Sequence, residues 1–207
     1  MSNIISYSQE NLDRIVDVLE RGGIVVFPTE TVYALACRAD DHSAAEKIYK
    51  IKGRTPDKVF AVLAPNVEFV DKYAEIEQKA YKLISKFSPG AVTYILPIKE
   101  GFNVSDYAVK GGRTGFRIPN HPVALEILNR CNFAVIATSV NRSGQKSADS
   151  VSEIDEVLLP EIDLVLDGEK SSGVSSGVFS FGEEDELKVI REGEVSFEEI
   201  QKAWKDL

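Results

Sequence analysis

The sequence predicts one layered α/β domain in which helices cover a twisted, mixed β-sheet. Short apolar runs rich in β-branched residues alternate with amphipathic segments of helical period along the chain. The 207 residues, 43% of them hydrophobic, can bury a substantial core and lie near the upper size of one domain. No internal repeat, low-complexity tract or linker divides them, so we expect residues 1–207 to form a single domain.

The first helix is expected at about residues 8–21, where apolar residues recur with helical spacing. Ser8 is a suitable N-cap, and the pair Gly22-Gly23 can end the helix. The run 24–27 is entirely apolar and rich in β-branched residues, which predicts a buried strand. Pro28 is expected to end that strand.

The remaining elements follow from the same patterns. Further helices are expected at about residues 43–51, 75–87, 121–130, 154–158 and 197–204. Further strands are expected at about residues 59–63, 92–98, 114–118, 133–137, 164–166, 178–181 and 187–190. The Ser/Gly-rich stretch 168–177 is expected to be a mobile loop.

Composition and charge argue against several classes of protein. The formal net charge of -9 disfavours an extended nucleic-acid surface. Cys37 and Cys131 lie far apart without paired spacing, which disfavours a disulfide framework or a zinc site. There is no apolar run of roughly 20 residues, the length needed to cross a membrane, and no secretory signal at the N-terminus. We therefore expect a cytoplasmic protein with no membrane contact.

Positive charge is concentrated in one short segment of this acidic chain. Only Asp57 opposes the five cations Lys47, Lys50, Lys52, Arg54 and Lys58. Such a local cluster favours the binding of a small anion.

Polar residues stand at the ends of two predicted strands. Thr29-Glu30-Thr31 follows the strand at 24–27, and Ser139-Val140-Asn141 follows the strand at 133–137. In open α/β sheets, ligands bind beyond strand ends, where loops present hydroxyls and backbone N–H groups. The alternative is that these side chains only cap helices or form turns.

Lys52-Gly53-Arg54 pairs a flexible point charge with a planar guanidinium that can bind carboxylate or phosphate through two parallel hydrogen bonds. Taken alone, it could equally be a solvated basic surface. There is no Walker-type phosphate loop and no dinucleotide fingerprint. His121 could act as a base, could cap a helix or could simply be exposed, and His42 has no evident partner.

Together these segments resemble the YrdC/TsaC family, the threonylcarbamoyl-AMP synthases of tRNA t6A biosynthesis. The resemblance covers about residues 8–195. It rests on the motifs Phe27-Pro28-Thr29-Glu30-Thr31-Val32-Tyr33, Lys52-Gly53-Arg54, Ser88-Pro89-Gly90 with Thr93, Arg117-Ile118-Pro119 with His121, and Ser139-Val140-Asn141 with Ser143-Gly144. The chain departs from the usual family residues at Ala34, Val59, Ala91 and Val140.

The resemblance implies a concave, cationic cavity and assigns site residues to it. The implied catalytic residues are Lys52, Arg54, Ser139 and Asn141. The implied ATP contacts are these four together with Thr93 and Arg191. The implied threonine contacts are Thr31, Lys58, Arg117 and Ser176, and no metal is expected to be held by the protein itself.

The implied reaction converts L-threonine, bicarbonate and ATP into threonylcarbamoyl-adenylate and pyrophosphate, and the ATP is expected to arrive with Mg²⁺. The product would pass to a threonylcarbamoyl-transferase complex that modifies tRNA, and direct tRNA binding by this chain is expected to be weak or absent. Two alternatives stay open: a carbamoyl-transfer paralogue with the same fold, and a non-catalytic RNA-binding or ribosome-assembly module.

Overall fold

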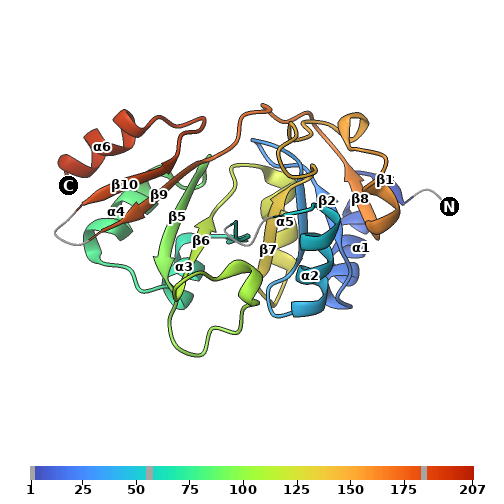
Figure 1. Cartoon of the computed structure of the whole chain (residues 1–207), viewed down its shortest axis with the longest axis horizontal. Coiled ribbons are helices and arrows are strands. Elements are labelled where there is room, and N and C mark those ends of the chain that lie inside the picture. The colour runs from blue at the N-terminus through green and yellow to red at the C-terminus, as the bar shows by residue number, and fades with distance from the viewer. Residues whose placement is uncertain (1–2, 55–57, 183–185) are drawn as a thin grey trace.

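The computed structural model describes residues 3–54, 58–182 and 186–207 (Figure 1). These parts contain a ten-stranded sheet with the strand order β1-β8-β2-β3-β7-β4-β6-β5-β9-β10. The strands are β1 Ile4–Ser6, β2 Val25–Phe27, β3 Ala34–Arg38, β4 Ala61–Leu63, β5 Val92–Pro97, β6 Arg113–Arg117, β7 Val135–Ser139, β8 Leu164–Asp167, β9 Gly177–Phe181 and β10 Leu187–Arg191.

Both parallel and antiparallel pairs occur, so the predicted mixed sheet is confirmed. For example, β4 pairs with β6 in parallel and with β7 antiparallel. The α-helices are α1 Gln9–Glu20, α2 His42–Ile51, α3 Val67–Tyr73, α4 Gln78–Phe87, α5 Pro122–Arg130 and α6 Phe197–Lys205. Three short 3₁₀ helices are η1 Asp106–Ala108, η2 Val151–Glu153 and η3 Leu159–Glu161.

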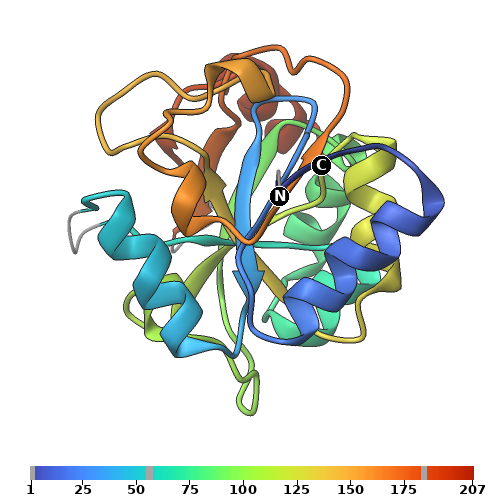
Figure 2. The ribbon, with the colours of Figure 1, turned by 90° about the vertical axis from the view of Figure 1, so that its right-hand side faces the viewer.

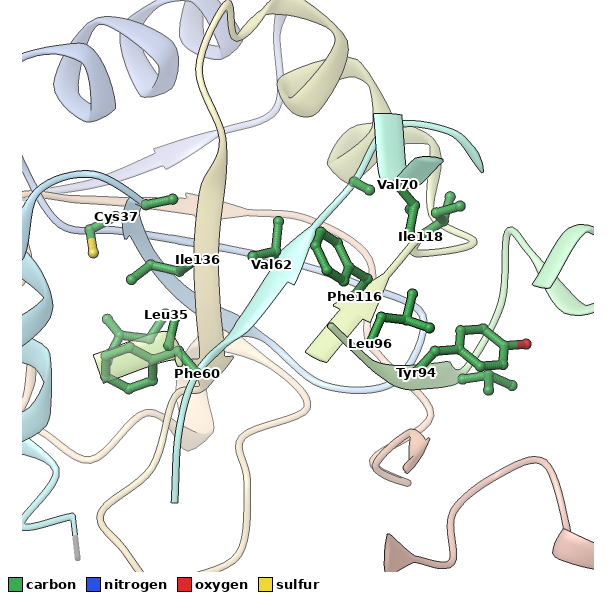
Figure 3. Close-up of a cluster of buried hydrophobic side chains, with 14 of the residues drawn as sticks. Leu35, Cys37, Phe60, Val62, Val70, Tyr94, Leu96, Phe116, Ile118 and Ile136 are labelled. Atoms are coloured by element: carbon green, nitrogen blue, oxygen red, sulfur yellow. The ribbon is translucent and has the colours of Figure 1, made fainter. Parts of the chain in front are cut away.

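Helices cover both faces of the sheet, and Figure 2 shows α1 and α2 on opposite sides of it. On one face α1 and α5 bury a cluster that includes Val25 and Phe27. On the other face a larger cluster includes Val26, and Figure 3 shows part of it around Val62 and Phe116. The strand β2 is therefore buried on both faces, which explains why its sequence is a continuous apolar run instead of an alternating one.

The first helix confirms its predicted cap, because the Ser8 hydroxyl accepts a hydrogen bond from the Asn11 N–H. The predicted helix at 154–158 is wrong, since these residues form a bend and a turn between η2 and η3. Within this stretch the Asp155 carboxylate accepts a hydrogen bond from the Val157 N–H at 3.0 Å. Such a local side-chain bond offers the backbone an alternative to helix.

Among the strands and α-helices of the described residues, three were not predicted: β1, β3 and α3. Strand β1 has only three residues, and β3 is built partly from alanines, which carry little strand signal. The predicted helix at 75–87 begins only at Gln78, while residues 67–73 form α3 behind an Asn66 cap. None of the helices in the described ranges is long and apolar enough to cross a membrane.

Candidate functional site

A cavity of about 430 Å³ lies over the central strands β7, β4, β6 and β5 and extends to β9 and β10. The sequence placed the site at strand ends, but the cavity also covers the middle of the strands. Nine predicted site residues line it: Lys52, Arg54, Lys58, Thr93, Arg117, Ser139, Asn141, Ser176 and Arg191. The structure thus brings together residues from six separate segments of the chain.

Lys52, at the C-terminal end of α2, is only 3% exposed. Its ammonium group donates hydrogen bonds to the Ser139 carbonyl, to the Asn141 carbonyl at 2.6 Å and to Asn141 Oδ1 at 3.2 Å. Burial and, to a lesser degree, the nearby Arg54 charge lower the pKa of Lys52 to about 7. Lys52 therefore ties α2 to the loop after β7 and is not a solvated surface cation.

The Asn141 side chain organises that same loop. Its Nδ2 donates to the carbonyls of Arg142 at 2.9 Å and Gln145 at 2.8 Å, and its Oδ1 accepts from the Ser139 hydroxyl as well as from Lys52. These contacts are those of a turn-forming asparagine. A ligand that bound the Asn141 amide would have to exchange one of them.

Arg54 is held by its neighbours through all three nitrogens of its guanidinium group. Its guanidinium donates to Thr138 Oγ1 at 2.6 Å, to the Val59 carbonyl at 2.7 Å and, through Nε, to the Lys58 carbonyl at 2.9 Å. The guanidinium carbon also lies 5.1 Å from the centre of the Phe60 ring. The side chain is thus oriented, while it still lines the cavity.

On the opposite wall, Arg191 anchors the loop before β9. Its Nη2 donates to the Ser176 carbonyl at 2.8 Å, and the Ser176 and Thr93 hydroxyls lie 3.0 Å apart. Burial and then the charge of Arg117 lower the pKa of Arg191. An anion between these two guanidinium groups would relieve both effects.

Arg117, the last residue of β6, is nearly buried. Its Nη2 donates to Thr31 Oγ1 at 2.7 Å and lies 2.8 Å from Glu30 Oε1. Thr31 is fully buried and is not among the residues that line the cavity. The structure therefore places Thr31, a predicted threonine contact, behind Arg117 and not in direct reach of the cavity.

His121 is the N-cap residue of α5, but its side chain makes no capping hydrogen bond and does not line the cavity. Burial lowers its pKa, an effect opposed by the charges of Glu30 and Glu169. Neither the base nor the capping interpretation of this side chain is therefore supported, and the exposed alternative is wrong because His121 is buried.

The stretch 168–177 is anchored, which corrects the expectation of a mobile loop. Its Ser172 and Gly173 N–H groups donate to the carbonyls of Glu30 at 2.9 Å and Thr31 at 2.8 Å. The Ser171 hydroxyl donates to the Thr29 carbonyl at 2.7 Å. A Ser/Gly-rich composition signals an irregular backbone, but it does not reveal these long-range partners.

The residues that form the floor of the cavity were not predicted from the sequence. Ala137, Ala61 and Gly115 lie directly opposite one another in β7, β4 and β6, and all three line the cavity. Small side chains at these positions leave room above the sheet. Isolated alanines and glycines in predicted strands carry no signal that they will become neighbours.

The cavity is strongly cationic. Its lining includes Lys52, Arg54, Lys58, Arg117 and Arg191, and no carboxylate among the described residues lines it. Asp57 lies outside the described residues. Such a site suits a ligand that carries several negative charges.

Comparison with known proteins gives a consistent result. Residues 17–193 match the Sua5/YciO/YrdC family model, which is described as "Telomere recombination". A putative threonylcarbamoyl-AMP synthase of Methanocaldococcus jannaschii is 30% identical over 201 residues, covering 95% of this chain and 94% of that protein. The threonylcarbamoyl-AMP synthase of Pyrococcus abyssi is 33% identical over 188 residues, covering 89% of this chain and 54% of that protein.

Solved structures agree with the fold. The structure of P. abyssi Sua5 complexed with L-threonine superposes with a TM-score of 0.88 at 30% identity, covering 97% of this chain and 60% of that one. E. coli YciO has a TM-score of 0.87 at 24% identity, covering 97% of this chain and all of that one, and so supports the fold alone. The chain thus spans nearly all of some relatives and little more than half of others.

Proposed function

The chain belongs to the Sua5/YciO/YrdC family, and we propose that it is a threonylcarbamoyl-AMP synthase. It joins L-threonine, bicarbonate and ATP into threonylcarbamoyl-adenylate and releases pyrophosphate. The names of its relatives favour this reaction over carbamoyl transfer and over a non-catalytic RNA-binding role.

The observation that carries the proposal is the cationic cavity itself. It holds Lys52, Arg54, Arg117 and Arg191 against a wall of hydroxyl groups. Threonine contributes a carboxylate, bicarbonate an anion and ATP a triphosphate, so a site for all three must neutralise negative charge. The bound threonine of the P. abyssi structure supports an amino-acid site in this fold.

The chemistry proceeds in two steps. The neutral amine of threonine forms an N–C bond with the carbon of CO₂ or bicarbonate, loses a proton, and becomes a carbamate; from bicarbonate, hydroxide also leaves. A carbamate oxygen then forms a bond to the α-phosphorus of ATP while the bond to pyrophosphate breaks. The protein acts chiefly by positioning the reactants and stabilising their charge.

Different residues of the cavity suit different substrates. For ATP, Arg54 and Arg191 neutralise phosphates, and Thr93, Ser139 and Asn141 offer hydrogen-bonding groups. Lys52 acts mainly by holding the Ser139–Asn141 loop.

For threonine, Arg117 binds the carboxylate, and Lys58 and Ser176 are the further contacts from the cavity lining. Thr31 contributes through its hydrogen bond to Arg117. Mg²⁺ is carried by the triphosphate and water, since the described lining offers no carboxylate to hold it.

In the cell, the product passes to a threonylcarbamoyl-transferase complex that modifies tRNA, and the enzyme acts in the cytoplasm. The net charge of -9 argues against strong direct binding of tRNA.

A pyrophosphate-release assay tests the function. Release is expected to require both threonine and bicarbonate, and Arg54→Ala should suppress it. Serine, which lacks one methyl group, should be a weaker substrate by about 1–3 kcal/mol. Equal release without any amino acid would indicate a simple ATPase and overturn the proposal.

A further inference from the structure

Glu30 stands apart from the residues assigned to the cavity above. It lies in the turn between β2 and β3, next to Thr31, and its carboxylate does not line the cavity. Glu30 Oε1 lies 2.8 Å from Arg117 Nη2, and the two side chains are 17% and 9% exposed. A nearly buried carboxylate therefore sits directly behind a cationic residue of the site.

The two charges depend on each other. Both carboxylate oxygens of Glu30 are inaccessible to solvent, and no hydrogen-bond donor among the described residues satisfies them. Arg117 is the cation with which Glu30 forms an ion pair in the described parts of the chain. An unpaired buried charge is very costly, so this pair is expected to persist.

The turn that carries Glu30 is itself fixed. The Glu30 carbonyl accepts a hydrogen bond from the Ser172 N–H at 2.9 Å, and the neighbouring Thr31 carbonyl accepts one from the Gly173 N–H at 2.8 Å. Thr31 Oγ1 in turn accepts the hydrogen bond from Arg117 Nη2. One end of the guanidinium is thus held by two side chains on an immobilised turn.

The Glu30 carboxylate also affects the charge balance of the cavity. Arg117 lies close enough to Arg191 for its charge to lower the pKa of Arg191. The two guanidinium groups therefore repel each other in a partly desolvated cavity. A carboxylate on the outer side of Arg117 offsets part of that repulsion without occupying the space of a ligand.

We propose that Glu30 is a positioning residue that fixes the Arg117 guanidinium in the orientation required to bind the substrate's carboxylate. The inference rests on the proposed function, because it takes Arg117 to contact the amino acid. Glu30 touches no substrate and acts through Arg117.

Glu30→Gln tests the role with almost no change in size. We expect the KM for threonine to rise about tenfold, the effect of losing one charge-assisted contact, while the KM for ATP stays within about twofold. Glu161→Gln is the matched control, because it removes an exposed carboxylate that pairs with Lys47 at 3.5 Å. This control should leave both KM values unchanged.

A double-mutant cycle separates positioning from a general structural effect. If Glu30 acts through Arg117, the pair Glu30→Gln with Arg117→Met should be no worse for threonine than Arg117→Met alone. Additive losses, or a wild-type KM in Glu30→Gln, would overturn the proposal. If Glu30→Gln does not fold, Thr31→Val removes the other group that holds Nη2 and should raise the KM for threonine about threefold. An unchanged KM in Thr31→Val would then count against the proposal.

Calorimetric titration with L-threonine distinguishes this inference from the proposed function. A wild-type chain that binds threonine but releases no pyrophosphate would refute the synthase activity, while weaker binding in Glu30→Gln would still support the role of Glu30. A wild-type chain that makes the product, together with a Glu30→Gln variant of unchanged affinity, would refute the role of Glu30 alone.

Discussion

Lys52, which the sequence indicates is part of a basic patch, is buried and is hydrogen-bonded to the loop after β7. Its ammonium group has three N–H donors, and the structure supplies three acceptors from the Ser139–Asn141 loop. Removing Lys52 would take this donor from the Asn141 carbonyl, while the Ser139 carbonyl would keep the Asn141 N–H; the loss of such a partner typically costs about 1–3 kcal/mol. Loss of activity in a Lys52 variant would therefore report on loop order as well as on charge.

The lowered pKa of Lys52 predicts a pH dependence of stability. The pKa is about 7 in the folded chain against an ordinary 10.5, so between these values the unfolded chain binds the additional proton. The destabilising contribution of Lys52 is fully present below about pH 7 and disappears as the pH rises towards 10.5. Urea unfolding of the wild type and of Lys52→Met at pH 6.5 and 9.5 measures this contribution. The free energy of unfolding of the wild type should rise relative to that of the variant at the higher pH.

A difference in stability between wild type and variant that stays constant over that range would show that the pKa of Lys52 is not lowered. Lys58→Met is the matched control, because Lys58 lies in the same cavity but is exposed.

Asn141→Ala should lower the melting temperature, because the amide makes four hydrogen bonds within its own surroundings. The ATP-induced rise in melting temperature should also shrink, since Ser139 and Lys52 lose their common partner. Ser143→Ala should retain the wild-type melting temperature, because the Ser143 N–H donates to the Lys52 carbonyl at 2.8 Å and alanine keeps this backbone bond. A native melting temperature in Asn141→Ala would contradict the structural role.

Among the elements, the row formed by β7, β4 and β6 determines the depth of the cavity. A Cβ atom at Gly115 would lie 3.0 Å from Thr93 Cγ2 and 3.4 Å from both Ala61 Cβ and Ile95 Cδ1. A Cβ atom at position 115 would therefore crowd the floor, and Thr93 would have to shift to admit it.

Gly115→Ala is accordingly expected to lower the free energy of unfolding by about 1–3 kcal/mol, the usual cost of overpacking. It should also raise the KM for ATP, because Thr93 is a proposed ATP contact. Urea unfolding and pyrophosphate-release kinetics measure the two effects. A fully active, equally stable variant would show that Thr93 can move without consequence.

The elements also show where sequence patterns succeed. Helix α1 lies within one residue of its predicted limits at either end, because its apolar stripe and Ser8 cap are both local signals. The strand predicted at 133–137 runs instead from Val135 to Ser139, so Ser139 belongs to the strand and does not follow it. Strand limits depend on pairing with β3 and β4, which the local sequence does not reveal.

For the whole molecule, overall charge and local charge have opposite signs. The chain carries -9, while the described lining of the cavity is cationic. A small anion can enter the cavity, whereas a polyanion also meets the acidic exterior.

We therefore expect no strong binding of tRNA, even at low salt. Fluorescence anisotropy with labelled tRNA at about 50 mM salt, a condition that favours phosphate contacts, measures this. Saturable binding that weakens steeply as salt is added would contradict the expectation and favour an RNA-binding role.

The sequence by itself determined the α/β class, the mixed sheet, the first helix and the identity of the polar residues that gather in the cavity. These features depend on local periodicity, caps and motifs, each of which is contained in a short segment. The site residues followed from the family resemblance that those motifs carry, and nine of the ten line one cavity.

Only the tertiary structure decided how these residues are used. It placed Thr31 behind Arg117, set Glu30 against the same guanidinium, and anchored the 168–177 stretch on the turn between β2 and β3. Each of these contacts joins residues more than 80 positions apart in the chain. Their partners are chosen by strand order and packing, and those depend on the whole chain at once.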